Sequence, residues 1–299
     1  MASHSKKVLI TGIDGFTGAH LEKRLLSNGY DVYGLTIADK KNKNYMTADL
    51  LDRESVKNAL QKIKPHYIIH LAAISFLKHP DPMDFYKVNI FGALNLLESI
   101  LEQKFNLKNI IIASSANIYG NIQSDLIDET MKPDPISHYA LSKYAMEQMT
   151  KNYFNDIKII ITRHFNYTGA GQSDNFLVPK IVNHFKEKKE TIELGNTDIA
   201  RDFSDVRDVA KAYEILLSSA DDSGIYNICS SEAVTLKQII CICGDITGHK
   251  IKIKSNPEYS RENEIKILKG SNSKIKKLGY IPEYSIEDTL KWMITSKQS

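Results

Sequence analysis

A glycine-rich turn that directly follows a short apolar strand is the feature that most restricts how this chain can fold. Residues 7–10 predict a buried strand, and residues 15–26 predict the helix that follows it. Glycines in such a turn let the chain bend tightly, approach a pyrophosphate closely and pack the helix against a sheet, and the helix N-terminus favours phosphate. We therefore predict a dinucleotide-binding turn. Its cofactor-binding residues are Gly12, Asp14, Gly15, Phe16, Thr17 and Gly18.

The N-terminal half alternates between strand and helix patterns, which predicts an α/β fold built on a Rossmann doubly wound parallel sheet. The expected strands cover 7–11, 31–37, 67–71, 109–114 and 157–162. The expected helices lie near 15–28, 52–63, 84–103 and 138–154. Right-handed crossovers place the loops after these strands at one edge of the sheet, where ligands bind.

The pattern changes near Asn166, where the loops lengthen and the elements become shorter. This change predicts a dinucleotide-binding Rossmann domain over 1–165 and a smaller C-terminal α/β substrate lobe over 166–299. Some segments of the second range are expected to return to the first domain.

Composition excludes several classes of function. The 39 basic and 36 acidic residues leave a net charge of +3, which is too even for a nucleic-acid groove. No apolar run reaches about 18 residues, so we expect no membrane span. The first residues lack an apolar signal core, so we expect a cytoplasmic protein. The cysteines lie in apolar sequence, which predicts buried reduced thiols and no metal site.

Tyr139 and Lys143 stand four residues apart in an expected helix, so they lie on one face, one turn apart. The ammonium lowers the pKa of the phenol, which can then give a proton to a carbonyl oxygen while a nicotinamide exchanges hydride with the attached carbon. Taken alone, such a pair is typical of an exposed helix surface, but the upstream glycine turn favours a redox site. His138 is an alternative base, although adjacent helix residues point apart.

Further segments resemble the extended short-chain dehydrogenase/reductase family, and within it the enzymes that modify nucleotide-activated sugars. The matching segments are Ala48-Asp49-Leu50, His70-Leu71-Ala72-Ala73, Val88-Asn89-Ile90-Phe91-Gly92, Ser114-Ser115-Ala116-Asn117-Ile118-Tyr119-Gly120 and Arg163-His164-Phe165-Asn166. The resemblance implies that Ser115, Tyr139 and Lys143 are catalytic. It implies cofactor contacts from Asp49, Leu50, Leu71, Ala72, Ala73, Asn89, Tyr139, Lys143 and Phe165.

The polar residues among these have structural alternatives. Asp49 could be a turn acceptor or cap, Asn89 a bridge between backbone segments, and Ser115 a satisfied hydroxyl at a strand end. Their positions after successive strands favour the functional interpretation. Serine and tyrosine hydroxyls that converge on one oxygen donate hydrogen bonds where negative charge develops during reduction of a ketone.

The end of the second expected strand bears on the cofactor. Thr36 occupies the position where NAD-preferring relatives usually carry an acidic residue, and the loss of that carboxylate removes repulsion against a 2′-phosphate. Lys40 or Lys41 could add positive charge, whereas Asp39 weakens the case. We therefore expect Thr36 to contact NADP(H), with NAD(H) as the alternative. A lysine loop without a ligand role is the competing interpretation.

The two residues directly after Ser115 narrow the choice of reaction. Related sugar 4,6-dehydratases carry an acidic residue there, whereas this chain has Ala116 and Asn117, so dehydration is disfavoured. The segments 195–209, 226–231, 261–264, 272–274 and 278–280 resemble those of GDP-4-keto-6-deoxymannose reductases. This resemblance implies NAD(P)H-dependent reduction of a C4 ketone to a GDP-rhamnose-type product. The alternatives are a nucleotide-sugar 4-epimerase that retains NAD and a non-enzymatic dinucleotide sensor.

The same resemblance implies a nucleotide-sugar substrate, bound by a set of residues mostly in the second half of the chain. These are Ser75, Asn117, Asn166, Val178, Lys180, Arg201, Arg261 and Glu264. Arg201 and Arg261 would bind the diphosphate, because a planar guanidinium suits phosphate oxygens. Their structural alternatives are pairs with nearby carboxylates. Glu262 and His164 stand where these reductases usually have proline, which leaves the sugar configuration and the nucleotide open.

The helices expected near 84–103 and 138–154 offer apolar positions beyond those needed to cover the sheet. In the resembling enzymes this helix pair forms a four-helix contact between two subunits. A homodimer is therefore expected.

Overall fold

The computed structural model describes residues 6–75, 79–103, 105–122, 124–219, 222–256 and 267–296. The chain divides into two compact units. The first comprises Met1–Gly120, Lys132–His164 and Ala210–Tyr226, and the second comprises Asn121–Met131, Phe165–Val209 and Asn227–Ser299. Residues 121–131, which fall within the predicted first domain, cluster with the second unit, and residues 210–226 return to the first.

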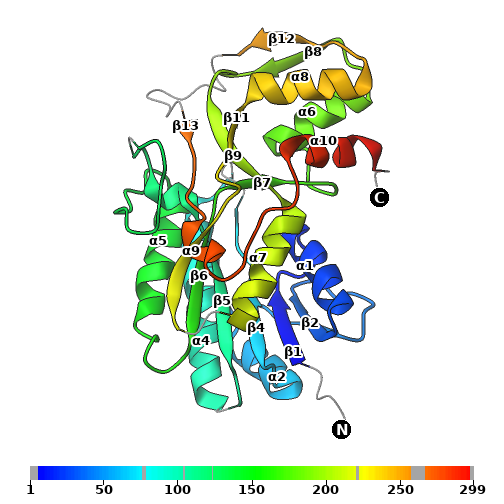
Figure 1. Cartoon of the computed structure of the whole chain (residues 1–299). Coiled ribbons are helices and arrows are strands. Elements are labelled where there is room, and N and C mark those ends of the chain that lie inside the picture. The colour runs from blue at the N-terminus through cyan, green and yellow to red at the C-terminus, as the bar shows by residue number, and fades with distance from the viewer. Residues whose placement is uncertain are drawn as a thin grey trace. The chain divides into compact units, whose positions relative to one another are not determined.

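The first unit contains a seven-stranded sheet in the order β10-β6-β5-β4-β1-β2-β3 (Figure 1). Its strands are β1 (Lys6–Thr11), β2 (Tyr30–Thr36), β3 (Tyr45–Thr47), β4 (Tyr67–His70), β5 (Asn109–Ser115), β6 (Ile159–His164) and β10 (Gly224–Ile228). The pairs from β3 through β6 are parallel, which confirms the doubly wound sheet. The sequence did not predict β3, because three residues are too few to show a period, or β10.

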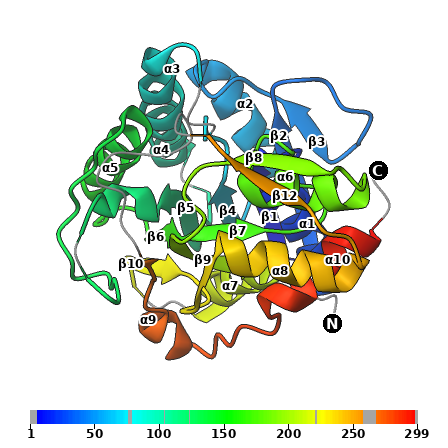
Figure 2. The same cartoon turned by 90° about the horizontal axis from the view of Figure 1, so that it is seen from above.

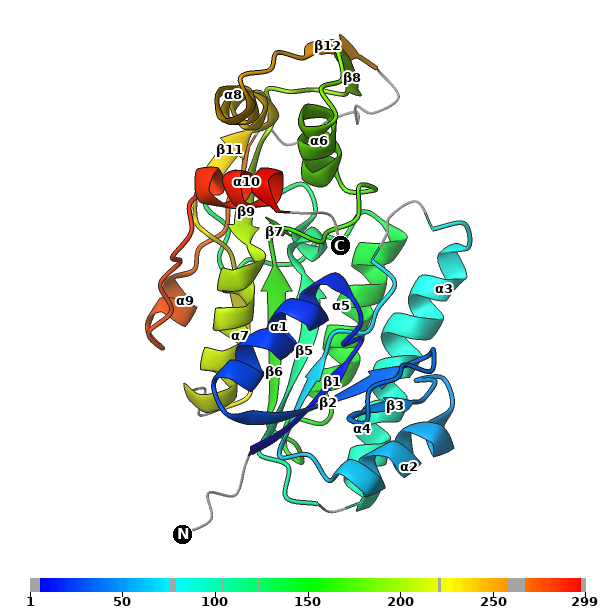
Figure 3. The same ribbon diagram turned by 90° about the vertical axis from the view of Figure 1, so that its right-hand side faces the viewer.

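Helices cover both faces of this sheet (Figures 2 and 3). They are α1 (Phe16–Ser27), α2 (Arg53–Ile63), α3 (Pro82–Tyr86), α4 (Gly92–Gln103), α5 (His138–Lys151) and α7 (Val206–Ser219). One face carries α1 and α7, which an ion pair between Arg24 and Glu214 joins at 2.6 Å. The other carries α2, α4 and α5, whose apolar side chains bury Leu9, Ile68, Ile110 and Ile161 of the sheet. A buried core on both faces gives the near-continuous apolar strands seen in the sequence.

The helix predicted near 84–103 is interrupted. It consists of α3, a π-helical turn at Lys87–Phe91, and α4. Such turns occur frequently at functional sites. Here the turn holds Asn89, whose side chain is fully buried.

The second unit is built from short strands and helices. Its elements are β7 (Asn166–Thr168), α6 (Leu177–Lys186), β8 (Thr191–Leu194), β9 (Ala200–Asp205), β11 (Ala233–Thr235), α8 (Leu236–Thr247), β12 (Lys252–Ser255), β13 (Ile267–Leu268), α9 (Ser273–Lys276) and α10 (Ile286–Thr295). Strand β9 pairs with β7, β11 and β13, and β8 pairs with β12. Apolar residues of α6, α8 and α10 form its core.

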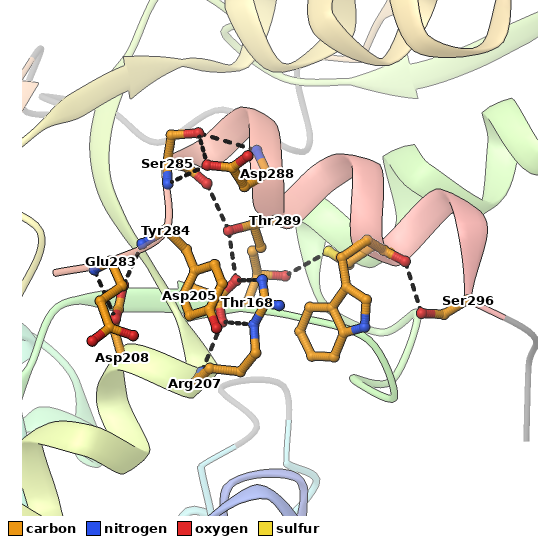
Figure 4. Close-up of polar contacts among 12 residues, drawn as sticks. Thr168, Asp205, Arg207, Asp208, Glu283, Tyr284, Ser285, Asp288, Thr289 and Ser296 are labelled. Carbon is orange, nitrogen blue, oxygen red and sulfur yellow. Dashed lines mark hydrogen bonds and ion pairs between the residues drawn. The ribbon is translucent and has the colours of Figure 1, made fainter.

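A polar cluster in this unit ties α10 to the end of β9 (Figure 4). The buried Asp205 carboxylate accepts hydrogen bonds from Arg207 Nε and Nη2, at 2.9 and 2.7 Å, and from Thr289 Oγ1 at 2.7 Å. The Arg207 guanidinium also lies 3.5 Å from the Tyr284 ring centroid and 4.0 Å from that of Trp292. Cation–π contacts and a bidentate ion pair therefore fix the C-terminal helix within its unit.

The cysteines are reduced, as predicted, but they are not all buried. Cys229 and Cys243 are buried, whereas Cys241 is exposed. Cys241 and Cys243 stand two residues apart on α8 and therefore point to different faces. Across the described residues, no helix is long and apolar enough to cross a membrane, and no cluster of His, Cys, Asp or Glu side chains could hold a metal ion.

Candidate active site

The glycine turn lies where the strand order of the first sheet reverses. Strand β1 pairs with β2 on one side and β4 on the other, so the turn after β1 faces the loop after β4. Thr11 joins them: its Oγ1 lies 2.8 Å from His70 Nδ1 and accepts a hydrogen bond from Ala72 N at 3.2 Å. Ligands of open α/β sheets bind at such a reversal, beyond the carboxyl ends of the strands.

Two glycines of the turn, Gly12 and Gly18, cannot carry side chains without movement of the backbone. Gly12 has φ of +69°, and a Cβ built on it would lie 2.9 Å from the backbone of Ala72. A Cβ on Gly18 would lie 2.5 Å from the carbonyl oxygens of Gly12 and Ile13. The close approach of these backbones leaves the cradle that a pyrophosphate needs, so the residues present fit a dinucleotide.

Helix α1 begins without a side-chain cap or an acidic residue in its first turn, which contains Phe16, Thr17 and Gly18. Its positive dipole end is therefore not neutralised from within the helix. Asp14 directly precedes this end, and Lys40 lies 3.7 Å from its carboxylate in a partly exposed ion pair. This ion pair places Lys40 beside the glycine turn.

The residues predicted to contact the adenosine half of the cofactor lie at the end of β2 and just after β3. Thr36 is buried, and its hydroxyl donates to the Ala38 carbonyl at 2.6 Å. Asp49 is exposed and accepts a hydrogen bond from Leu51 N at 2.9 Å, the turn role that was its structural alternative. Leu50 is buried in the sheet core, and Leu71, Ala72 and Ala73 are half-buried in the loop after β4. These positions remain predictions as cofactor contacts.

Helix α5 presents the predicted catalytic pair, Tyr139 and Lys143. Ser137 caps its N-terminus by accepting a hydrogen bond from Ala140 N at 3.2 Å. Tyr139 is buried against Phe85, with ring centroids 6.0 Å apart, and Lys143 is buried one turn further on. The Lys143 Nζ donates to the carbonyl of Ala113 at 2.8 Å. Because Ala113 lies on β5 two residues before Ser115, this bond fixes the helix beside the strand that carries the serine.

Ser115 ends β5 and begins a 3-10 turn at Ala116–Tyr119. Its hydroxyl accepts a hydrogen bond from Asn117 N at 3.2 Å. The oxygen is the acceptor in that bond, so the hydroxyl proton can still be donated to a substrate oxygen. Asn117 itself is exposed.

His138, the alternative base, is also exposed, and its Nδ1 lies 2.8 Å from the Tyr86 hydroxyl, on a different side of α5 from the buried Tyr139.

Burial shapes the charges of this site. It lowers the pKa of Lys143 to about 8, against the attraction of Glu147, which raises it. Burial, followed by repulsion from Lys143, lowers the pKa of both His70 and His164 to about 3. Both imidazoles are therefore neutral at physiological pH, while Lys143 is mostly an ammonium.

The two buried histidines predict a loss of stability in acid. Their pKa values rise from about 3 in the folded chain to about 6.5 on unfolding, so the unfolded state binds more protons below pH 6.5. Their stabilising contribution is complete above pH 6.5 and is lost as the pH falls towards 3, by up to about 1.4 kcal/mol per pH unit for each histidine. Urea unfolding of the wild type and His70→Asn between pH 7 and pH 5 measures this. An equal slope in both proteins would contradict it.

Asn89 connects the loop after β4 to α5. Its Oδ1 accepts from Ile74 N at 3.0 Å, and its Nδ2 donates to Ile74 O at 3.3 Å and to Ser142 Oγ at 3.0 Å. Ser142 lies between Tyr139 and Lys143 and donates to the Tyr139 carbonyl at 2.8 Å. These bonds give Asn89 the backbone-bridging role that was its structural alternative. Ser75, the next residue of the loop, is exposed.

The remaining predicted residues belong to the second unit. Phe165 is buried there against Gly270, and Asn166 Nδ2 donates to the Asp202 carbonyl at 3.4 Å. Arg201 lies next to Asp202 on β9, and its Nη1 donates to the Ala200 carbonyl at 2.9 Å, while Asp205 forms an ion pair with Arg207. The other predicted positions are Val178, which is buried in the core of α6, α8 and α10, and Lys180, whose Nζ donates to Glu193 O at 3.1 Å. Arg261 and Glu264 lie outside the described residues.

A buried ion pair that the sequence did not predict lies behind Tyr139 and Lys143. Glu147 stands four residues after Lys143, the same spacing as between Tyr139 and Lys143, and it contacts Arg163 of β6. The repeated spacing was a signal available in the sequence, although it does not by itself identify the partner.

Comparisons with known proteins place this chain among enzymes of nucleotide sugars. The family model described as GDP-mannose 4,6 dehydratase matches residues 9–293. A GDP-6-deoxy-D-talose 4-dehydrogenase of Aggregatibacter actinomycetemcomitans is 37% identical over 90% of each chain. A GDP-6-deoxy-D-mannose reductase of Pseudomonas aeruginosa is 27% identical over 99% of this chain and 98% of the relative.

Two solved structures share the fold over 97% of each chain. One, from Burkholderia cenocepacia J2315, carries a provisional epimerase assignment and matches with a TM-score of 0.92 at 38% identity. The other is RMD from Pseudomonas aeruginosa in complex with NADPH, with a TM-score of 0.86 at 27% identity.

Proposed function

We propose, from the premise that this chain belongs to the GDP-mannose 4,6-dehydratase-like extended short-chain dehydrogenase/reductase family, that it reduces the C4 ketone of a GDP-linked 4-keto-6-deoxy sugar. Family membership makes it an NAD(P)-dependent enzyme. The GDP moiety and the 6-deoxy sugar rest on the names of the two curated relatives, which both act on GDP-6-deoxyhexoses.

One observation carries the choice of reaction. The hydroxyls of Ser115 and Tyr139 belong to β5 and α5, which Lys143 joins, and the turn after Ser115 contains Ala116 and Asn117. Removal of water across C5 and C6 needs a further acid/base group, which this turn does not carry. The set of donors suits transfer of one proton to a ketone oxygen, so reduction is favoured over dehydration.

When bound, the reduced nicotinamide supplies hydride to C4 of the sugar. Ser115 donates a hydrogen bond to the C4 oxygen, where negative charge develops. Tyr139 transfers its phenolic proton to that oxygen, so the C=O group becomes CH–OH, and the phenolate then regains a proton from solvent. Lys143 stabilises the phenolate through its positive charge. Each turnover thus consumes one reduced cofactor and one proton.

We propose NADP(H) as the preferred cofactor. Support comes from Thr36, which brings no carboxylate to the end of β2, from Lys40 beside the glycine turn, and from the similar reductase that was solved with NADPH. The NAD(H) alternative predicts a higher rate with NADH than with NADPH. Steady-state rates with both cofactors decide between them.

The configuration at C4 distinguishes two products. GDP-6-deoxy-D-mannose and GDP-6-deoxy-D-talose are C4 epimers, and the two curated relatives are named for one each. We propose to incubate the protein with NADP⁺ and each GDP sugar separately, and to follow NADPH absorbance. Oxidation of one epimer identifies the natural product. Oxidation of neither, together with interconversion of UDP-hexoses without added cofactor, would support a 4-epimerase that retains NAD.

We further propose that the second unit supplies substrate contacts through Asn166, Lys180 and Arg201, with Arg201 binding a phosphate. Arg201→Met should then raise KM for the GDP sugar more than it lowers kcat. An unchanged KM would leave Arg201 without this role.

We also propose a homodimer formed through α4 and α5. Phe91, beside α4, Leu101 and Leu141 expose 53%, 37% and 42% of their surface, an apolar set that a second copy could cover. A monomer mass in sedimentation equilibrium would reject the dimer.

A further inference from the structure

Helix α5 places three ionisable side chains on one buried face. Tyr139, Lys143 and Glu147 succeed one another at intervals of four residues, which is one helical turn each. Their exposed fractions are 9%, 3% and 0%. The face that carries the catalytic pair therefore continues into a buried carboxylate.

The Glu147 carboxylate is held by Arg163 of β6 in a bidentate ion pair. Arg163 Nε lies 3.1 Å from Oε1 and Nη2 lies 2.7 Å from Oε2. The remaining terminal nitrogen, Nη1, donates to the Tyr119 hydroxyl at 3.0 Å. Tyr119 is fully buried and ends the 3-10 turn that begins after Ser115. One guanidinium thus connects the helix of Tyr139 and Lys143 with the turn of Ser115.

A buried ion pair of this kind is a weak source of stability, because the cost of removing two charges from water offsets their attraction. Apolar side chains of similar volume would fill the same space. The position of the pair, between the two catalytic elements and one turn from Lys143, indicates a different role.

The charges around Lys143 show which group acts on it. The ionisable side chains of α5 besides Lys143 are His138, Tyr139, Tyr144, Glu147 and Lys151. Those of the elements around it include His70, Asp84, Tyr86, Lys87, Glu98, Glu102, Tyr119, Arg163 and His164. His70 and His164 are neutral because burial lowers their pKa values to about 3. Asp84 contacts His79, and Glu98 forms an ion pair with Arg53; both contacts are partly exposed. Glu147 is the carboxylate that raises the pKa of Lys143 against the effect of burial.

We propose that Glu147 and Arg163 are positioning residues for the proposed reduction: Glu147 keeps Lys143 charged, and Arg163, through Tyr119, fixes the Ser115 turn against α5. The inference rests on the proposed function, because it assigns these residues to the reaction of Ser115, Tyr139 and Lys143. Neither residue touches the reacting atoms. Their effect is exerted through the charge and placement of groups that do.

Glu147→Gln tests the effect of the Glu147 carboxylate on the charge of Lys143. In the wild type, activity should fall as the pH rises past about 8, because Lys143 loses its proton there. Loss of the Glu147 charge should move this alkaline limit to lower pH by about one unit, since removal of a negative charge lowers the pKa of neighbouring groups. The pH dependence of NADPH affinity, followed by cofactor fluorescence, should shift in the same direction without any turnover.

Tyr119→Phe is the matched variant for position. It removes the Tyr119 hydroxyl, and with it the hydrogen bond to Arg163, and leaves every charge in place. We expect kcat to fall several-fold while the alkaline limit and the NADPH affinity stay at their wild-type values. An unchanged kcat would overturn the role of Arg163 in placing Ser115.

A double variant, Glu147→Gln with Arg163→Gln, covers the case in which the single substitution leaves Arg163 unpaired and the protein unfolded. It removes both buried charges, and the alkaline limit should still move to lower pH because Glu147 is the group that acts on Lys143. A lower melting temperature with an unshifted limit and unshifted NADPH affinity would show a purely structural pair. A wild type that oxidises no NADPH with any GDP-4-keto sugar would instead reject the proposed function.

Discussion

Replacement of Tyr139 by phenylalanine should lower kcat by roughly 10² to 10⁴, the range of a general acid, while NADPH affinity stays near its wild-type value. The phenol supplies the proton that the ketone oxygen must gain, and phenylalanine keeps the ring that packs against Phe85. Stopped-flow absorbance with saturating GDP-4-keto sugar measures the rate, and fluorescence titration measures NADPH binding.

Tyr86→Phe is the control for this substitution. Its hydroxyl contacts His138 next to Tyr139 but lies on the exposed side of α5. Loss of this partly exposed contact should change kcat by no more than about twofold, as is usual for surface substitutions. Near wild-type turnover in Tyr139→Phe would remove Tyr139 as the proton donor.

Gly12→Ala should weaken NADPH binding by about tenfold or more, equivalent to about 1.4 kcal/mol. The new Cβ would lie 2.9 Å from the backbone of Ala72, so the glycine turn and the loop after β4 must separate. The positive φ of +69° adds strain. Both changes disturb the cradle in which we place the pyrophosphate. Equilibrium fluorescence titration gives the change in affinity directly.

Gly29→Ala is the control that introduces backbone strain without the close contact that Gly12→Ala makes with Ala72. Gly29 has a similar φ of +80°, but nothing lies within 4 Å of a Cβ built on it. This variant should lose about 1 kcal/mol of stability from strain and keep its NADPH affinity. If both variants bind NADPH equally well, the close contact between Gly12 and Ala72 has no part in the cofactor site.

The sequence was sufficient for the parts of the fold that depend on periodicity and turn chemistry. Strand β1, the glycine turn and α1 are predictable from an apolar run, three glycines and an amphipathic helix. The π-helical turn was not predictable, because the stretch 84–103 has the pattern of one helix and the interruption reflects the bonds of Asn89 with Ile74 and Ser142. Those partners come together only in the folded chain.

The candidate site also has one part that the sequence predicts and one part that it does not. The spacing of Tyr139 and Lys143 predicted a shared helix face, which the structure confirms. The charge of Lys143 depends on burial and on Glu147, and the role of Arg163 depends on its distance to Glu147 and Tyr119. A sequence gives neither burial nor a distance between α5 and β6, so this part of the site required coordinates.

The most direct test of the proposed activity is the loss of NADPH absorbance when the purified protein is mixed with GDP-4-keto-6-deoxymannose. The dTDP-linked keto sugar and NADH serve as parallel controls for the nucleotide and the cofactor. We predict oxidation of one NADPH for each GDP sugar reduced, with a slower reaction in both controls. No oxidation of NADPH or NADH with the GDP sugar would contradict it.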